Sequence, residues 1–112
     1  MPDEDFVPKP FRCEVIERDG AVWVCPHGEL DMSTVPELEQ HLHDAVAGGA
    51  RRIVVDLRGL DFMDSTGLTL VTRFNNDSRR NGFEFALVKG DARIQRLFDL
   101  TGLGDHFAFV AA

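Results

Sequence analysis

A hydroxyl-bearing segment with acidic neighbours, residues 60–68, is the part of the chain whose residue types best suit chemistry. It follows a short apolar run, 53–57, and precedes apolar residues at helical spacing, so it joins a strand end to a helix start. Asp64 or Ser65 can cap that helix by accepting backbone N–H groups, and Gly67 leaves room for another molecule at the first turn. Exposed N–H groups and the helix dipole favour an anion there. The local fold can therefore tolerate a phosphate on Ser65.

Each polar or apolar residue of this region also has a purely structural interpretation. On Asp-Ser-Thr-Gly alone, Ser65 is more often a helix cap than a phosphorylation site. Thr66 could accept a phosphate, or it could cap or pack at the first turn. Leu68 and Met63 are either core residues or partner-facing, and spacing does not separate these roles. Asp31 either caps the turn into the preceding helix or acts functionally.

Patterns typical of catalysis are weak in this sequence. The four histidines are scattered, and His41 and His43, two residues apart on an expected helix, point to different sides. The segment 64–67 has one residue more than the Asp-Ser/Thr-Gly motif of aspartic proteases and offers no second carboxylate for a dyad. Asp56 and Asp61 are expected to be solvated or turn-stabilising carboxylates. We therefore expect no enzymatic activity and no cofactor.

The two cysteines, Cys13 and Cys25, do not form a zinc-binding pattern. Both flank the same expected turn at 19–20, so they could lie near each other. We expect reduced thiols and no metal site.

The elements that must position residues 60–68 can be predicted along the chain. Asp-Gly between the β-rich runs 11–17 and 21–26 predicts an antiparallel hairpin. Ser33 or Thr34 before Pro and Glu marks the start of a first helix. Further apolar patterns predict helices at 35–46, 67–80 and 92–100 and strands at 53–57, 83–88 and 107–110. The order ββαβαβαβ predicts an α/β fold with a mixed central sheet covered by helices.

Length and charge narrow the class of protein. The 112 residues suit one domain at 11–112, after a proline-rich, acidic segment 1–10 that we expect to be a flexible tail. A net charge of −7 disfavours nucleic-acid binding, because phosphate neutralisation needs a basic surface. The sequence has neither an apolar run long enough to span a membrane nor a signal-peptide pattern. We expect a cytoplasmic protein that binds another protein and has no membrane association.

Three segments in order resemble one known family. Residues 60–68 resemble the phosphorylation loop of STAS-domain anti-sigma-factor antagonists, in which Asp-Ser-Ser/Thr-Gly-Leu opens the second helix. Gly28-Glu29-Leu30-Asp31 resembles the segment before that family's first helix, and residues 95–103 resemble its last helix and the following turn. The resemblance covers roughly residues 11–110 and implies the STAS fold.

The resemblance also implies a function. In that family the unphosphorylated antagonist binds an anti-sigma factor that is also a serine kinase, and thereby releases the sigma factor. Phosphorylation of a serine, here Ser65, switches binding off, and a serine phosphatase restores it. The implied partner-binding residues are Asp31, Asp64, Ser65, Thr66, Gly67 and Leu68.

The charges around Ser65 provide a mechanism for such a switch. A phosphoserine adds about −1.5 to −2 charges, close to Asp31, Asp61 and Asp64. We expect a monomer with nearly the same fold in both phosphorylation states. The alternative function is a constitutive STAS subunit of a stress-signalling or lipid-transport complex, which would not require Ser65.

Overall fold

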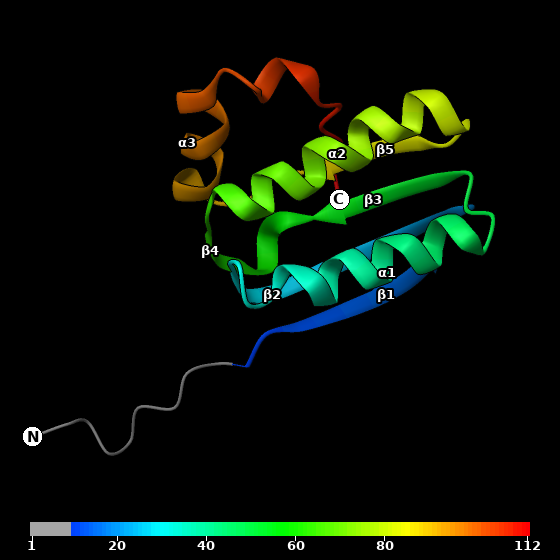
Figure 1. Cartoon of the computed structure of the whole chain (residues 1–112), viewed down its shortest axis with the longest axis horizontal. Helices are drawn as coiled ribbons and strands as arrows, with labels where there is room; N and C mark the ends of the chain where they lie inside the picture. The colour runs from blue at the N-terminus through cyan, green and yellow to red at the C-terminus, as the bar shows by residue number, and fades with distance from the viewer. Residues whose placement is uncertain (1–9) are drawn as a thin grey trace, which may run out of the picture.

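The structure is a computed structural model that describes residues 10–112. A sheet forms one layer, and two helices lie side by side across one of its faces (Figure 1). The third helix lies at the end of the molecule where the second helix begins. The elements in chain order are β1 Arg12–Arg18, β2 Ala21–Leu30, α1 Val35–Ala47, β3 Arg52–Asp56, η1 Leu57–Gly59, β4 Leu60–Met63, α2 Ser65–Asn81, β5 Glu84–Val88, α3 Ala92–Thr101 and η2 Gly104–His106. The predicted tail at 1–10 lies outside the described residues except for Pro10.

The sheet mixes one antiparallel pair with parallel pairs, and its main strand order is β1-β2-β3-β5. β1 and β2 form the predicted hairpin, and the turn residues Asp19 and Gly20 both have positive φ, 53° and 78°. Such angles match the two-residue turns that suit twisted strands. β2 pairs with β3, and β3 with β5, in parallel after helical crossovers. The predicted hairpin and mixed, helix-covered sheet are confirmed.

The structure corrects the predicted strands at two places. Residues 60–63 form an additional short strand, β4, which pairs in parallel with the end of β2. The strand predicted at 107–110 is reduced to a single bridge between Leu87 and Phe109. Phe107 and Phe109 pack their rings against Phe98 of α3, so this segment follows β5 only briefly. The sheet edge beyond β5 is therefore covered by an irregular C-terminal segment.

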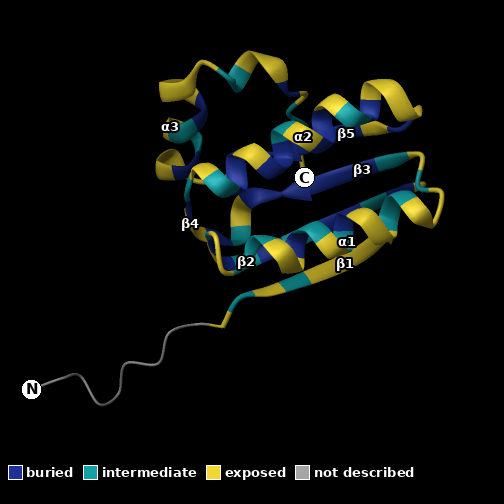
Figure 2. Ribbon diagram, in the orientation of Figure 1, coloured by how far each residue is buried: buried dark blue, intermediate teal, exposed yellow. Residues whose placement is uncertain are grey.

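The main core lies between the sheet and the helices. Buried residues line the inward faces of α1 and α2 and the central strands (Figure 2). A smaller apolar cluster covers the opposite face, where the Arg18 guanidinium lies 4.0 Å from the centroid of the Trp23 ring. Residues on the helix side include Val24, Ile53, Val55, Leu87, Leu38, Leu42, Leu70, Val71 and Phe74. Both faces of β3 are thus buried, as its continuous apolar run predicts.

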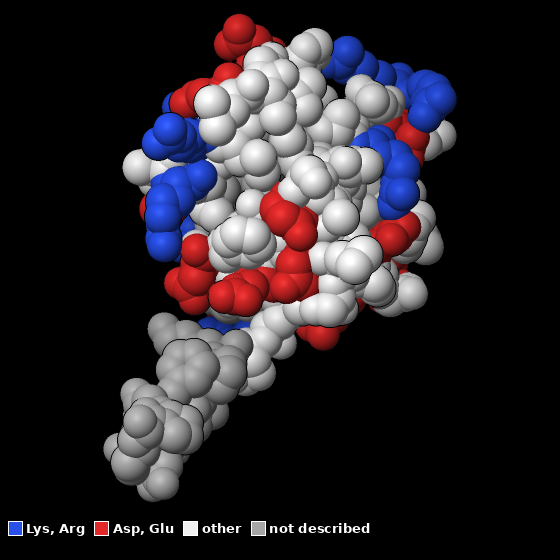
Figure 3. Space-filling view, turned by 60° about the vertical axis from the view of Figure 1, so that its left-hand side comes forward, with Lys and Arg blue, Asp and Glu red and all other residues white. Residues whose placement is uncertain are grey.

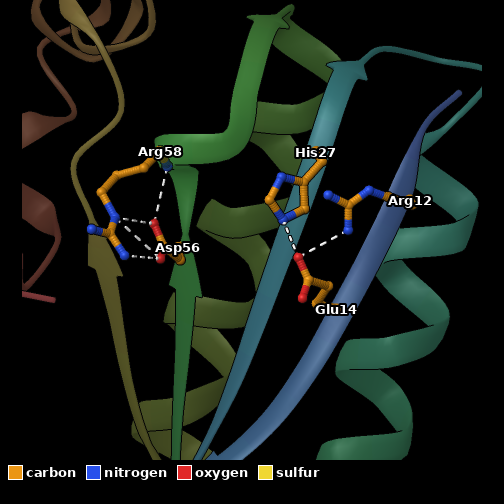
Figure 4. A network of polar contacts seen from close by, with 5 residues as sticks. All are labelled: Arg12, Glu14, His27, Asp56 and Arg58. Carbon is orange, nitrogen blue, oxygen red and sulfur yellow. Dashed lines mark hydrogen bonds and ion pairs between the residues drawn. The ribbon is translucent and has the colours of Figure 1, made fainter. Parts of the chain in front are cut away.

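Polar side chains on the sheet face opposite α1 and α2 form two small networks (Figure 4). The Glu14 carboxylate accepts a hydrogen bond from Arg12 at 2.9 Å and lies 2.7 Å from His27 Nε2. Asp56 is 7% exposed and accepts hydrogen bonds from the Arg58 backbone at 3.0 Å and from its guanidinium at 2.8 Å. Asp56 therefore stabilises the η1 turn, which confirms one of its two expected roles.

The two cysteines are free thiols on opposite faces of the hairpin. Cys13 is opposite Pro26 and packs on the helix side, whereas Cys25 is opposite Glu14 and packs with the smaller cluster. Their closeness along the hairpin therefore does not bring the two thiols together. Among the described helices, none combines the length and apolar character needed to cross a membrane.

Candidate functional site

The junction between β4 and α2 places Asp64 as the helix cap. Its backbone is extended, and its Oδ1 accepts the N–H groups of Thr66 at 2.9 Å and Gly67 at 3.4 Å. The Thr66 hydroxyl donates to the same oxygen. Of the two capping candidates in the sequence, Asp64 therefore has this role. The Ser65 side chain is left for another use.

Ser65 is the first residue of α2, and its side chain is exposed. Among residues 10–112 its hydroxyl has no hydrogen-bond partner; only its backbone carbonyl is engaged, by the Thr69 hydroxyl at 2.8 Å. Thr66 is half-buried and its hydroxyl is bound to Asp64. Ser65 is thus the more accessible of the two neighbouring hydroxyls. It also lies where helix N–H groups favour an anion.

The pairing of β4 with β2 brings the Asp31 loop to the same end of the molecule. Leu30 is paired with Met63, and the Asp64 N–H donates to the Leu30 carbonyl at 3.1 Å. Asp31 follows directly and accepts hydrogen bonds from the Ser33 hydroxyl at 2.6 Å and its N–H at 2.9 Å. These bonds lower the pKa of Asp31, so it is a carboxylate at neutral pH. The geometry gives Asp31 the turn-capping role.

Gly67 faces the interior, which corrects the expectation that it leaves room for another molecule at the first turn, and Leu68 is largely buried as well. A Cβ on Gly67 would lie 2.8 Å from both Leu30 Cδ2 and Met63 Cγ. Gly67 therefore allows α2 to pack closely on the core. It does not leave room for another molecule at the first turn of α2. Leu68 is 4% exposed and Met63 is 6% exposed, so both are core residues. This leaves Asp31, Asp64, Ser65 and Thr66 as the predicted residues with some exposed surface.

The surface around Ser65 is acidic and partly apolar. Figure 3 shows acidic side chains gathered beside an uncharged area on the end of the molecule where α2 begins. The two segments that carry Asp31 and Ser65, residues 28–50 and 59–72, contain no Lys or Arg. Their acidic side chains are therefore not neutralised by a Lys or Arg from the same segments. Met32 and Phe62 are 77% and 47% exposed. Exposed apolar side chains beside a polar rim are typical of protein interaction surfaces.

A groove of about 570 Å³ extends from Ser65 along α2 toward the segment after α3. Its lining includes Thr69, Thr72 and Leu103, with Leu68 at its floor. Arg73 also lines it, but Arg73 lies eight positions after Ser65 on the helix, about 12 Å at 1.5 Å per residue. Arg73 is moreover paired with Glu39. A phosphate on Ser65 would therefore have no nearby cation along α2.

The chain matches the family model described as the STAS domain over residues 12–111. It therefore belongs to the STAS domain family, and the fold that the sequence predicts is confirmed. Within that class, it is 44% identical over 78 residues to an anti-sigma-B factor antagonist of Staphylococcus aureus. The match covers 70% of this chain and 72% of the relative.

Solved structures support the same assignment of the fold. An anti-sigma factor antagonist from Mycobacterium paratuberculosis superposes with a TM-score of 0.84 at 29% identity, over 95% of this chain and 92% of that one. The Bacillus protein SpoIIAA in its phosphorylated form superposes with a TM-score of 0.66 at 25% identity, over 91% and 92%. Its unphosphorylated form gives a TM-score of 0.72 at the same identity, over 91% and 89%.

Proposed function

We propose that this protein is an anti-sigma-factor antagonist whose binding to an anti-sigma factor is switched off by phosphorylation of Ser65. The observation that carries the proposal is the exposed, unengaged Ser65 hydroxyl at the first residue of α2, beside an acidic surface. Relatives named as anti-sigma factor antagonists support the partner class. The protein acts by binding and not by catalysis.

The proposed partners follow from this function. The anti-sigma factor is also the serine kinase that modifies Ser65, and a serine phosphatase removes the phosphate. Binding of the unphosphorylated form releases the sigma factor for transcription. In this proposal the protein acts as a monomer in the cytoplasm. Met32, Phe62 and the groove beside Ser65 supply apolar area for such a contact.

The proposed switch is electrostatic. Asp31 and Asp64 flank the loop, and a phosphate on Ser65 would add about −1.5 to −2 charges to this surface. One new like-charge contact at about 4 Å costs about 4 kcal/mol at an effective dielectric of about 20. Each 1.4 kcal/mol changes affinity about tenfold. If the interface buries Ser65 against an acidic group of the partner, phosphorylation would therefore lower the affinity about a thousandfold.

The modification site can be tested with ATP, magnesium and each anti-sigma kinase encoded in the same genome. Mass spectrometry then locates phosphate on the wild-type chain and on Ser65→Ala and Thr66→Val variants. We expect phosphate on the wild type and on Thr66→Val, and none on Ser65→Ala. Phosphate that persists on Ser65→Ala would contradict the assignment.

A binding experiment with two Ser65 variants distinguishes the phosphorylation switch from a constitutive subunit role. Ser65→Asp adds one negative charge permanently, whereas Ser65→Ala removes the hydroxyl without adding charge. We expect Ser65→Asp to lose binding to the anti-sigma factor and Ser65→Ala to keep it. Equal binding by both variants would favour the constitutive STAS subunit.

A further inference from the structure

Three side chains with metal-binding atoms converge between the edge strand β1 and α1. They are Cys13, Glu37 and His41, and one ligand atom from each lies within 4.8 Å of the other two. Cys13 is on the side of β1 that packs against the core beneath the helices. Glu37 and His41 are four residues apart on α1, so they share one face of the helix.

The ligand atoms of this cluster are not used by other contacts. Within residues 10–112, the three side chains make no hydrogen bond or ion pair. The other histidines with nearby carboxylates differ: His27 lies 2.7 Å from Glu14, and His43 lies 3.4 Å from Glu39. His43 also packs its ring against Phe74 of α2. His41 and His43 therefore point to different sides, as their spacing predicts, and His41 is the one directed toward β1.

We propose that Cys13, Glu37 and His41 form a Zn²⁺ site that joins β1 to α1, with water in the fourth position. Thiolate, imidazole and carboxylate are the side-chain ligands that zinc uses. Around a tetrahedral ion such ligand atoms lie about 3.6 Å apart, given bonds of about 2.0 to 2.3 Å. The remaining gap is closed by side-chain rotation, for which the exposed Glu37 is free.

The sequence gives no sign of this site, because its ligands come from β1 and α1, which only the folded structure brings together. Binding forms a zinc–sulfur bond and breaks the Cys13 S–H bond, and the proton passes to solvent. Without the ion, burial first, and then the charges of Glu37 and Cys25, raise the pKa of Cys13 to about 12. A dication beside the same thiol opposes these effects, since it favours the thiolate.

Cobalt is the direct probe, because Co²⁺ occupies zinc sites and its thiolate complexes absorb in the near ultraviolet. The full chain is reduced, freed of metal with a chelator and titrated with Co²⁺. We expect a sulfur-to-cobalt band that saturates at one ion per chain and disappears when Zn²⁺ is added. Mg²⁺ should not displace the cobalt, since it prefers oxygen ligands. No band, or a band that does not saturate at one ion, would overturn the proposal.

Variants with matched controls assign the ligands. Cys13→Ser should abolish the band, and His41→Gln and Glu37→Gln should each weaken Zn²⁺ binding at least tenfold. Cys25→Ser and His43→Gln change the other thiol of the hairpin and the other histidine of α1, and both should bind as the wild type does. Loss of the band in Cys25→Ser would contradict the assignment.

Alkylation of the wild-type chain tests the site without any substitution that could disturb folding. Mass spectrometry follows the reaction of iodoacetamide at each cysteine with and without Zn²⁺. Zinc should slow the reaction at Cys13 at least tenfold and leave Cys25 unchanged. Equal rates at Cys13 with and without zinc would overturn the proposal. The outcome is independent of Ser65, so it does not bear on the proposed switch.

Discussion

Asp64 and Ser65 are neighbours in the chain but have different surroundings. Asp64 is held by hydrogen bonds from the first turn of α2, whereas the Ser65 hydroxyl faces solvent. Because Asp64 already supplies the cap, modification of Ser65 need not uncap the helix. The capping carboxylate also lies beside the serine in the chain.

The two residues should therefore differ in their effects on stability. Replacing Asp64 by Ala removes the acceptor of two backbone N–H groups and should lower the free energy of unfolding by about 1 kcal/mol, within a range of about 0.5–2 kcal/mol. Ser65→Ala is the matched control, and its effect should stay within about 0.5 kcal/mol. Urea denaturation of both variants provides the measurement. A larger loss in Ser65→Ala than in Asp64→Ala would show that the cap is assigned to the wrong residue.

Asp56 gives a second prediction, on the pH dependence of stability. Burial of its carboxylate raises the pKa, but the hydrogen bonds and charge of Arg58 outweigh burial and lower it overall. A lowered pKa in the folded state means that the carboxylate stabilises the fold above its unfolded pKa of about 4. That contribution is lost as the pH falls through the folded pKa.

Asp56→Asn should accordingly be less stable than the wild type by about 1–3 kcal/mol at pH 7. The difference should shrink as the pH falls below about 4, because the carboxyl of the unfolded wild-type chain is then protonated and this favours unfolding. Urea midpoints measured between pH 7 and pH 3 test this, with exposed Asp61→Asn as the control. A difference between wild type and Asp56→Asn that is constant across this range would contradict the role of the charge.

At the scale of elements, β4 decides how the site is assembled. It pairs with the end of β2, and so it places the start of α2 beside the Asp31 loop. The four residues of β4 alternate neither with period two nor with helical spacing, since the outer two are buried and the inner two are exposed. Sequence periodicity therefore could not predict this strand, although it predicted the hairpin, the three helices and the buried strand β3.

The role of Gly67 was missed, and that of Leu68 was left open, for the same reason. The side of α2 that faces the core depends on where β4 ends. That point is set by contacts of Leu30, which is far from Gly67 along the chain, and of Met63, which lies before the helix. The sequence predicted a helix cap at Asp64 or Ser65 and an acidic surface around them, because these depend on residues within one turn. The C-terminal strand was overestimated because the apolar residues at 107–110 pack partly on α3.

Gly67→Ala tests this packing of α2 directly. An added Cβ would meet Leu30, which is fully buried, and Met63 at 2.8 Å. We expect destabilisation by about 1–3 kcal/mol from overpacking, although Ala is favoured over Gly in a helix by about 1 kcal/mol. Thr69→Ala, on the exposed side of the same helix, should change stability by no more than about 0.5 kcal/mol. A Gly67→Ala protein as stable as the wild type in thermal denaturation would refute the close approach.

At the scale of the whole molecule, one folded unit carries at one end the acidic surface where we propose that the partner binds. The SpoIIAA structures in phosphorylated and unphosphorylated forms both share this fold. A phosphate on Ser65 would sit at a helix N-terminus, where N–H groups and the dipole favour an anion. The switch that we propose therefore acts on the interface and leaves the fold unchanged.

Backbone amide NMR spectra of the phosphorylated and unphosphorylated chains can check this expectation. Shifts should be confined to the start of α2 and the Asp31 loop, and the amide and indole signals of Trp23 on the far sheet face should not move. Shifts spread across β1, β3 and β5 would indicate a conformational switch in place of an electrostatic one.

The most direct test of the central claim is the affinity of the anti-sigma factor for the chain before and after stoichiometric phosphorylation of Ser65, measured by calorimetry. We predict tight one-to-one binding before phosphorylation and an affinity about a thousandfold lower afterwards, in line with a like-charge cost of about 4 kcal/mol. Treatment with a serine phosphatase should restore the original affinity. Equal affinity in the two states would contradict the account.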